Sequence, residues 1–99
     1  MKILALEREL PGAAPDAFGK LSRAEAARLW ELVQGGVVRE TWFRAGRSEA
    51  VLALECGTEE EASKQLASLP LVQAGLITFD LIPLAPYPGF ARLFAQEVE

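Results

Sequence analysis

The segment Gly75–Ile82 constrains the fold of this chain most, because its apolar residues occupy both faces of a predicted strand. A strand with one covered face alternates apolar and polar residues along its length. A chain of 99 residues has room for a single core. We therefore expect something outside the chain to cover the second face. The two apolar sets are Ile77, Phe79 and Leu81 on one face and Leu76 and Ile82 on the other.

Composition and charge indicate an ordinary globular domain. Hydrophobic residues make up 51% of the sequence and charged residues 24%, which is typical of a folded chain. The formal charge of -4 argues against the basic surface that nucleic acids and anionic membranes require, so neither is an expected partner. The apolar start at Met1–Leu6 is too short for a signal peptide, and we expect a cytoplasmic protein.

The chain contains no histidine and a single cysteine, Cys56. The absence of histidine excludes Ser-His-Asp triads, Cys-His nucleophiles and most zinc sites, and one cysteine cannot form an internal disulfide. The acidic run Glu59–Glu61 is interpreted as a cluster that favours a helix N-terminus. We therefore expect no metal and no cofactor, and any acid-base chemistry would fall to Asp, Glu, Tyr or Lys.

Strands and helices are predicted in the order strand, helix, strand, strand, helix, strand. Ser22 with Glu25 forms a capping box that opens the first helix, and Thr58 with Glu61 forms a second one. Pro11–Gly19 is predicted to be a loop because of its prolines and glycines. Glycines end the first helix and Pro70 ends the second. The predicted strands are 2–9, 37–44, 49–56 and 75–82, and the predicted helix-side core is Leu29, Trp30, Val33, Leu66 and Leu69.

This order predicts a ferredoxin-like α+β fold, with a four-stranded antiparallel sheet and both helices on one face. The open face would be a larger apolar patch than monomers usually expose. We therefore expect residues 1–99 to form one domain that pairs into a homodimer or a ring of dimers. Residues 83–99 form a proline-stiffened tail with a short helix predicted from Pro88 to Gln96. Its large apolar side chains are expected to dock on the partner.

Several short segments resemble those of muconolactone isomerases and their relatives. They are Trp42-Phe43-Arg44-Ala45-Gly46, the strand after it, Leu69-Pro70-Leu71 and the final strand. The resemblance implies a dimeric α+β barrel and a cofactor-free, isomerase-like activity on a small carbonyl or lactone compound. This chain has Phe43 where the isomerases have arginine, with Arg44 one position later, and it has Arg47 where they have histidine.

Glu7, Glu55 and Asp80 are the predicted catalytic residues. With the first and third strands taken as parallel neighbours, Glu7 and Glu55 emerge at one end of the open face, which Asp80 shares. In that arrangement Leu4 and Leu6 face the helices. Carboxylates inside an apolar barrel have raised pKa values and could move a proton next to a carbonyl. The alternative places Glu7 and Glu55 at the rim, solvated or paired with arginines.

A second group of side chains is predicted to contact a small-molecule ligand. Arg44 and Arg39 are the expected anion partners, and Thr78 shares the open face. Either Trp42 or Phe43 lines the barrel, because neighbouring strand residues point to opposite faces. Tyr87, between two prolines, caps the barrel mouth or lies against a partner subunit. Two functional classes stay open: an isomerase-like enzyme, and a non-catalytic binding or assembly module.

Overall fold

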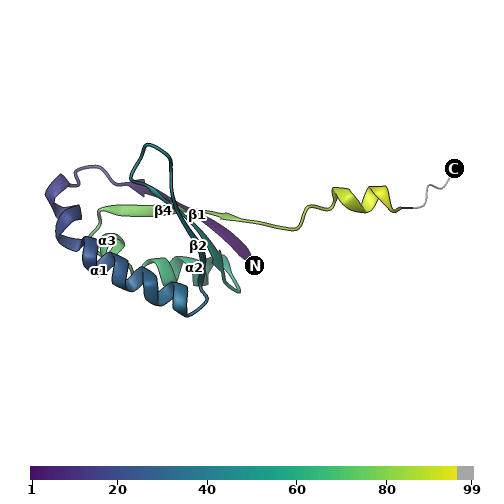
Figure 1. Ribbon diagram of the computed structural model, residues 1–99, viewed down its shortest axis with the longest axis horizontal. Coiled ribbons are helices and arrows are strands. Elements are labelled where there is room, and N and C mark those ends of the chain that lie inside the picture. The colour runs from purple at the N-terminus through teal and green to yellow at the C-terminus, as the bar shows by residue number, and fades with distance from the viewer. Residues whose placement is uncertain (96–99) are drawn as a thin grey trace.

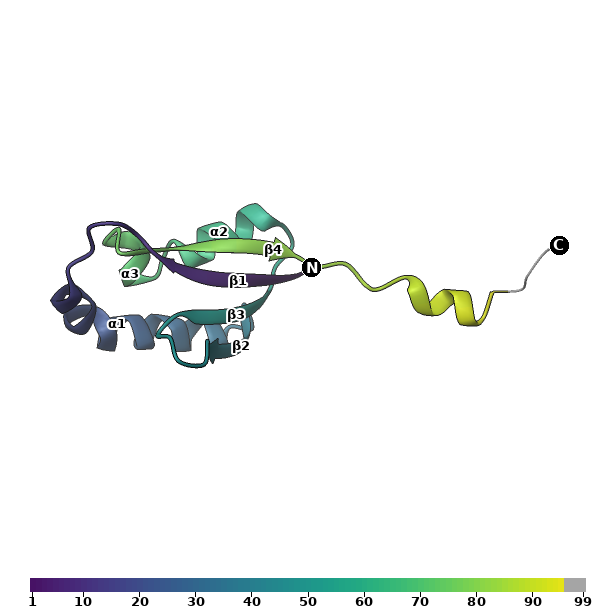
Figure 2. The same ribbon diagram turned by 90° about the horizontal axis from the view of Figure 1, so that it is seen from above.

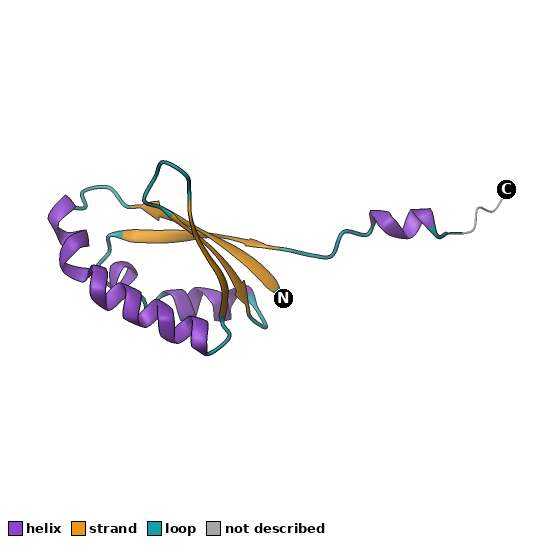
Figure 3. Cartoon of the chain, viewed as in Figure 1, coloured by secondary structure: helices purple, strands orange, loops and turns teal. Residues whose placement is uncertain are grey.

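The computed structural model describes residues 1–95 as a four-stranded sheet with helices on one face and a C-terminal segment that extends away from it (Figure 1). In Figure 3 the orange strands lie above the purple helices that pack on the sheet, and another purple helix lies out on the C-terminal segment. The elements are β1 (Lys2–Glu9), α1 (Pro15–Gln34), β2 (Val38–Phe43), β3 (Ala50–Glu55), α2 (Glu59–Leu66), α3 (Pro70–Gln73), β4 (Ile77–Pro83) and the 3-10 helix η1 (Gly89–Leu93).

The strand order β2-β3-β1-β4 confirms the predicted ferredoxin-like α+β class. Each neighbouring pair of strands is antiparallel. The prediction that the first and third strands run parallel was therefore wrong. In this topology α1 carries the chain back so that β1 and β2 are the parallel strands, and β3 lies between them in the opposite direction.

Helix α1 begins earlier than predicted. It starts at Pro15. Proline suits the first helical position because it lacks an N–H, and an N–H at that position would have no acceptor within the helix. Most of the segment predicted as a loop, Pro11–Gly19, is therefore helix, and the capping box at Ser22 was wrong. The Ser22 hydroxyl instead donates to the Gly19 carbonyl one turn back, at 3.0 Å, which leaves the Glu25 carboxylate free to reach another element.

The second helical region begins as predicted and ends differently. The Glu61 amide donates to Thr58 Oγ1 at 3.0 Å, and the Glu61 carboxylate accepts from the Gly57 amide at 2.9 Å. These two bonds satisfy N–H groups that a helix start leaves without partners. Pro70 does not simply end the helix: α2 stops at Leu66, and Pro70 starts the single turn α3.

The core lies between the helices and one face of the sheet. Leu66 and Leu69 are buried as predicted, but the Trp30 side chain is 60% exposed and was wrongly placed in the core. Leu32, two positions along α1, is buried in its stead, because Leu29, Leu32 and Val33 share the helix face that meets the sheet.

Strand β1 presents the opposite faces from those predicted. Ile3 pairs with Leu54 and Ala5 pairs with Leu52, and directly paired residues share a face. Ile3 and Ala5 are fully buried under the helices, so Leu4 and Leu6 lie on the open face. Near its start β1 has apolar residues on both faces. The sequence pattern alone therefore could not show which face of β1 lies toward the helices.

The open face carries apolar side chains that no described element covers. Leu6 and Trp42 both pair with Val51, so these three side chains lie together there. Trp42 is 62% exposed. Phe43 pairs with Ala50 and points to the helix side, which resolves the face of each aromatic residue.

The sheet ends close to the predicted position. Strand β4 stops at Pro83, and the Leu84 amide donates to the Lys2 carbonyl at 2.9 Å. The chain then runs out from the sheet to η1 (Figure 2), and the molecule measures 66 × 28 × 21 Å. The predicted helix is this shorter 3-10 turn, and Gln96 lies outside the described residues. Across residues 1–95, every helix is too short or too polar to cross a membrane.

Candidate functional site

A cavity of about 440 Å³ lies between α1 and the helix-facing side of the sheet. This volume is in the range of small-molecule sites in proteins. Its walls are mostly apolar, and two carboxylates, Glu7 and Glu25, are the charged side chains among its lining residues. The lining residues used below are Phe18, Ser22, Glu25 and Leu29 of α1, Glu7 of β1, Phe43 of β2, Leu71 of α3 and Phe79 of β4.

One face of helix α1 forms one wall of the cavity. Phe18, Ser22, Glu25 and Leu29 follow at intervals of four, three and four residues, so they share one face of the helix. On the sheet, Glu7 pairs directly with Phe79, and both residues point to that helix face. The cavity is therefore closed by one helix face and by neighbouring positions on two adjacent strands.

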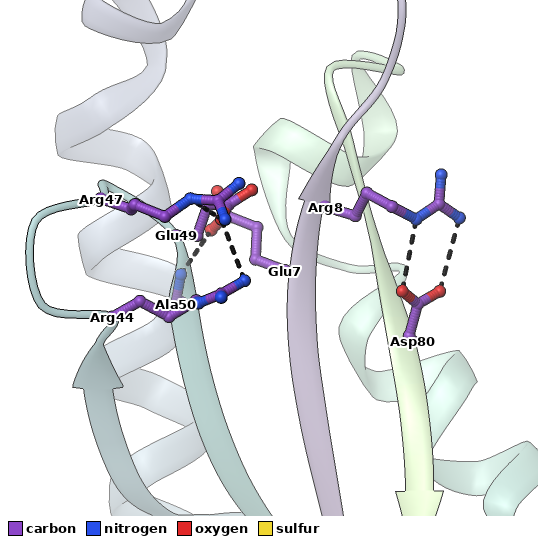
Figure 4. Close-up of polar contacts among 7 residues, drawn as sticks. All are labelled: Glu7, Arg8, Arg44, Arg47, Glu49, Ala50 and Asp80. Carbon is purple, nitrogen blue, oxygen red and sulfur yellow. Dashed lines mark hydrogen bonds and ion pairs between the residues drawn. The ribbon is translucent and has the colours of Figure 1, made fainter.

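The Glu7 carboxylate lies at the end of β1 and points toward the β2–β3 turn (Figure 4). Its Oε1 accepts a hydrogen bond from the Ala50 amide at 3.3 Å. Burial among apolar side chains raises the pKa of Glu7, and the negative charges of Glu25 and Glu49 raise it further, while the Ala50 bond opposes them. Removal of water disfavours the ionised form of a carboxyl group, so Glu7 holds a proton more readily than an exposed glutamate.

The Glu25 carboxylate joins α1 to α3. Its Oε1 accepts a hydrogen bond from the Leu71 amide at 2.9 Å, an N–H in the first turn of α3 that has no partner within that helix. Burial raises the pKa of Glu25, and the Leu71 bond opposes the rise. Two half-buried carboxylates with raised pKa values thus share one apolar cavity, an arrangement that is frequent where proteins transfer protons.

Two arginines stand beside this cavity on the β2–β3 turn. Arg44 Nη1 lies 3.5 Å and Arg47 Nε 2.8 Å from Glu49 Oε1 (Figure 4). Among the described residues this oxygen has no aligned hydrogen-bond donor, so the contact with Arg47 is an ion pair without hydrogen-bond geometry. Both arginines are more than half exposed. Arg44, a predicted anion partner, therefore lies near the cavity with its charge already shared with Glu49.

The structure does not bring the three predicted catalytic carboxylates together. Glu55 pairs with Lys2 at the other end of β1 from Glu7, because β1 and β3 are antiparallel. The terminal amine of Met1 donates to the exposed Glu55 carboxylate and lowers its pKa. Asp80 is on the open face, where Arg8 donates to it at 3.3 and 3.4 Å (Figure 4). Of the three, Glu7 alone lines the cavity.

Most of the predicted ligand-binding residues also lie elsewhere. Arg39 donates to the Gly36 carbonyl at 2.6 Å, at the start of β2. Thr78 pairs with Arg8 and, like Trp42, is on the open face. Tyr87 belongs to the extended tail. The sequence left open whether Trp42 or Phe43 lines the interior. The structure places Phe43 in the lining of this cavity.

Glu25 is a cavity-lining carboxylate that the sequence did not predict. As half of the predicted capping box with Ser22, Glu25 is expected at an exposed helix start rather than in a cavity. The signal that could have found it is its position between Phe18 and Leu29 on one helix face, where a lone carboxylate interrupts a set of core-facing residues. Within residues 1–95, no three Cys, Asp or Glu side chains gather in a way that could hold a metal ion.

Solved structures of other proteins share this architecture. Muconolactone isomerase superposes with a TM-score of 0.73 at 21% sequence identity, over 89% of this chain and 92% of that one. This chain has a muconolactone isomerase-like fold. The 5-chloro-2-hydroxyhydroquinone dehydrochlorinase of Burkholderia phenoliruptrix AC1100, in complex with 2,5-dihydroxybenzoquinone, matches with a TM-score of 0.66 at 18% identity, over 86% and 94% of the two chains.

The likeness to the muconolactone isomerase-like fold is one of architecture. Identities of 21% and 18% establish the arrangement of strands and helices, whereas activity depends on the side chains of a site. No protein-family model matches the chain, and no curated protein sequence matches it. The function must therefore be argued from the cavity itself.

Proposed function

We propose that this protein binds a small, largely apolar carbonyl compound in the cavity between α1 and the sheet and moves a proton on it. The observation that carries the proposal is that Glu7 and Glu25, both with raised pKa values, line one apolar cavity of about 440 Å³. The fold is that of muconolactone isomerase and of a dehydrochlorinase that holds a dihydroxybenzoquinone. Both names describe small cyclic carbonyl or hydroxylated ring compounds.

The two carboxylates divide the chemistry between them. Like charges in a shared cavity disfavour double ionisation, so the pair retains one proton over part of the pH range. Glu7, ionised, takes a proton from a carbon next to the carbonyl. Glu25, protonated, donates a hydrogen bond to the carbonyl oxygen as negative charge develops there. Return of the proton to another carbon of the conjugated system moves the double bond and leaves the composition unchanged.

The turn between β2 and β3 supplies the anion partner in this proposal. Arg44 and Arg47 flank the cavity and share Glu49, so a ligand carboxylate at the mouth would compete with Glu49 for guanidinium groups already held in place. Arg39, Glu55 and Asp80 have no part in the revised site because their partners lie elsewhere.

Exchange of a carbon-bound proton between a bound probe compound and the solvent tests the proposal. Muconolactone and 2,5-dihydroxybenzoquinone are the probes, and the readouts are NMR shift changes at cavity residues and loss of a carbon-bound proton to D₂O. We expect Glu7→Gln to slow that exchange by about 100-fold or more, as loss of a general base does. The control Glu31→Gln changes an exposed carboxylate of α1 that does not line the cavity and should leave exchange unaltered.

The competing function is a non-catalytic binding module, and the same experiment separates the two. Shift changes at the cavity without exchange would support binding alone, because the cavity would then hold the probe without moving its proton. Absence of both at millimolar probe would contradict the proposed function as a whole.

We also propose that two copies pair through their open sheet faces. Leu6, Val51 and Trp42 lie together on that face, and Ile82 on it is 41% exposed. A stable pair needs about 1,200 to 2,000 Å² of buried surface, which an apolar sheet face of four strands can supply. The muconolactone isomerase-like fold agrees with self-association of this kind.

A further inference from the structure

A second cavity adjoins the one that Glu7 and Glu25 line. It measures about 330 Å³ and lies between α1 and the edge strand β2. Thr41 and Trp42 of β2 line the second cavity but not the first, whereas four apolar residues line both. The two spaces are therefore neighbours that share a wall. The shared residues are Leu29, Phe43, Ala50 and Leu52.

Phe43 is the largest side chain of this shared wall. It pairs with Ala50, whose methyl group leaves space beside the ring. Strand β2 is an edge of the sheet (Figure 2), so within residues 1–95 no further strand flanks Phe43. The residue is 68% exposed although it points to the helix side. Exposed side chains change rotamer within nanoseconds, so Phe43 is a movable part of the wall.

The second cavity offers apolar contact without acid-base groups. All of its lining residues are uncharged, whereas the carboxylates Glu7 and Glu25 line the first cavity. A ligand that occupied both cavities would place its carbonyl group next to the carboxylates and an apolar part next to Leu29 and Leu52. Each methylene group buried in the second cavity would tighten binding by up to about 4-fold.

We propose that Phe43 is a specificity-determining residue, whose ring separates the two cavities in the free protein and turns aside when one ligand occupies both. The inference rests on the proposed function and adds the class of ligand to it. That ligand has a compact ring with the carbonyl group and a short linear apolar substituent. A linear chain passes beside the turned ring, whereas a branched substituent of the same composition is wider and would overlap it.

Affinities measured by isothermal titration calorimetry test the role of Phe43. The probes are 2,5-dihydroxybenzoquinone and its n-butyl and tert-butyl derivatives. We expect the wild type to bind the n-butyl compound about 10-fold or more tighter than either of the other two. Phe43→Ala removes the ring and should reduce the preference for n-butyl over tert-butyl to less than about 3-fold. An equal preference in the wild type and in Phe43→Ala would overturn the role of Phe43.

A substitution at Thr41 tests the second cavity separately. Thr41→Phe fills that cavity from β2 and should reduce the gain from the n-butyl chain to less than about 3-fold. Thr41→Val keeps the size of threonine and is the matched control, which should retain the gain. Circular dichroism checks that each variant is folded.

NMR of the wild type supplies a measurement that does not depend on any variant. Contacts should appear between the bound butyl chain and the Thr41 methyl group. Binding of the n-butyl compound without those contacts, while cavity residues around Glu7 still respond, would overturn this inference and leave the proposed function intact. Absence of binding by every probe at millimolar concentration would contradict both.

Discussion

Glu7 and Glu25 line the same apolar cavity from β1 and α1, and each is held by one backbone amide, that of Ala50 and that of Leu71 respectively. A backbone donor fixes the position of a carboxylate without adding a positive charge. Burial therefore still raises the pKa of both residues, whereas an arginine partner at the same place would have lowered it. The pair is both positioned and able to hold a proton.

We expect the stability of the fold to fall as pH rises through the pKa values of Glu7 and Glu25. Their folded-state pKa values are raised above the ordinary 4.5, so between 4.5 and those values the folded chain binds more protons than the unfolded chain. Glu7→Gln with Glu25→Gln should flatten this decline. Urea unfolding below and above pH 4.5 measures it, and an unchanged slope would contradict the raised pKa values.

Leu66→Ala is expected to lower the free energy of unfolding by about 2 to 5 kcal/mol, because it leaves a cavity in the core. The Leu66 side chain is 3% exposed. Trp30→Ala, at a larger but 60% exposed side chain, should change it by less than about 1 kcal/mol. Chemical denaturation compares the two, and equal effects would show that the helix faces are wrongly assigned.

Thr58→Ala is expected to cost about 1 kcal/mol, since it removes the side-chain acceptor for the Glu61 amide at the start of α2. Thr58→Ser keeps a hydroxyl oxygen in place and should retain most of the stability. The midpoint of urea unfolding reports the difference. If serine and alanine destabilised the protein equally, the hydroxyl would not be acting as a cap.

Val51→Asp is expected to weaken self-association by about 100-fold or more, because a two-fold contact would bring two desolvated like charges together. Val51 lies between Leu6 and Trp42 on the open face. Thr41→Asp places the same charge on the neighbouring strand but on the helix-facing side. Sedimentation equilibrium should separate the two variants, and equal association would place the contact elsewhere.

The fold class could be predicted because element order and capping are local signals. Thr58 and Glu61 start α2 as their spacing indicates, and prolines end the sheet near Ile82. The first helix was predicted too late because Pro15 and Gly19 count as loop residues by composition, although proline at a first helical position favours a helix.

The site was harder to predict, because it depends on pairing that sequence alone does not contain. Glu7 lines the cavity because β1 is antiparallel to both of its neighbouring strands. The assumption that β1 and β3 are parallel wrongly placed Glu7 next to Glu55. Side chains alternate with a period of two, so an error of direction or of one position exchanges the faces of a strand. The position of the Glu25 carboxylate depends further on its hydrogen bond with Leu71 of α3, which is 46 positions away in sequence.

Strand β1 also limits where the chain can change in length. Ile3, Ala5 and Glu7 face the core and cavity, and the residues between them face the proposed partner. Deletion of one residue within β1 would exchange the two faces for the residues on one side of the deletion, so that core or cavity side chains there would face the proposed partner. Insertions and deletions should therefore be selected against along the whole of β1.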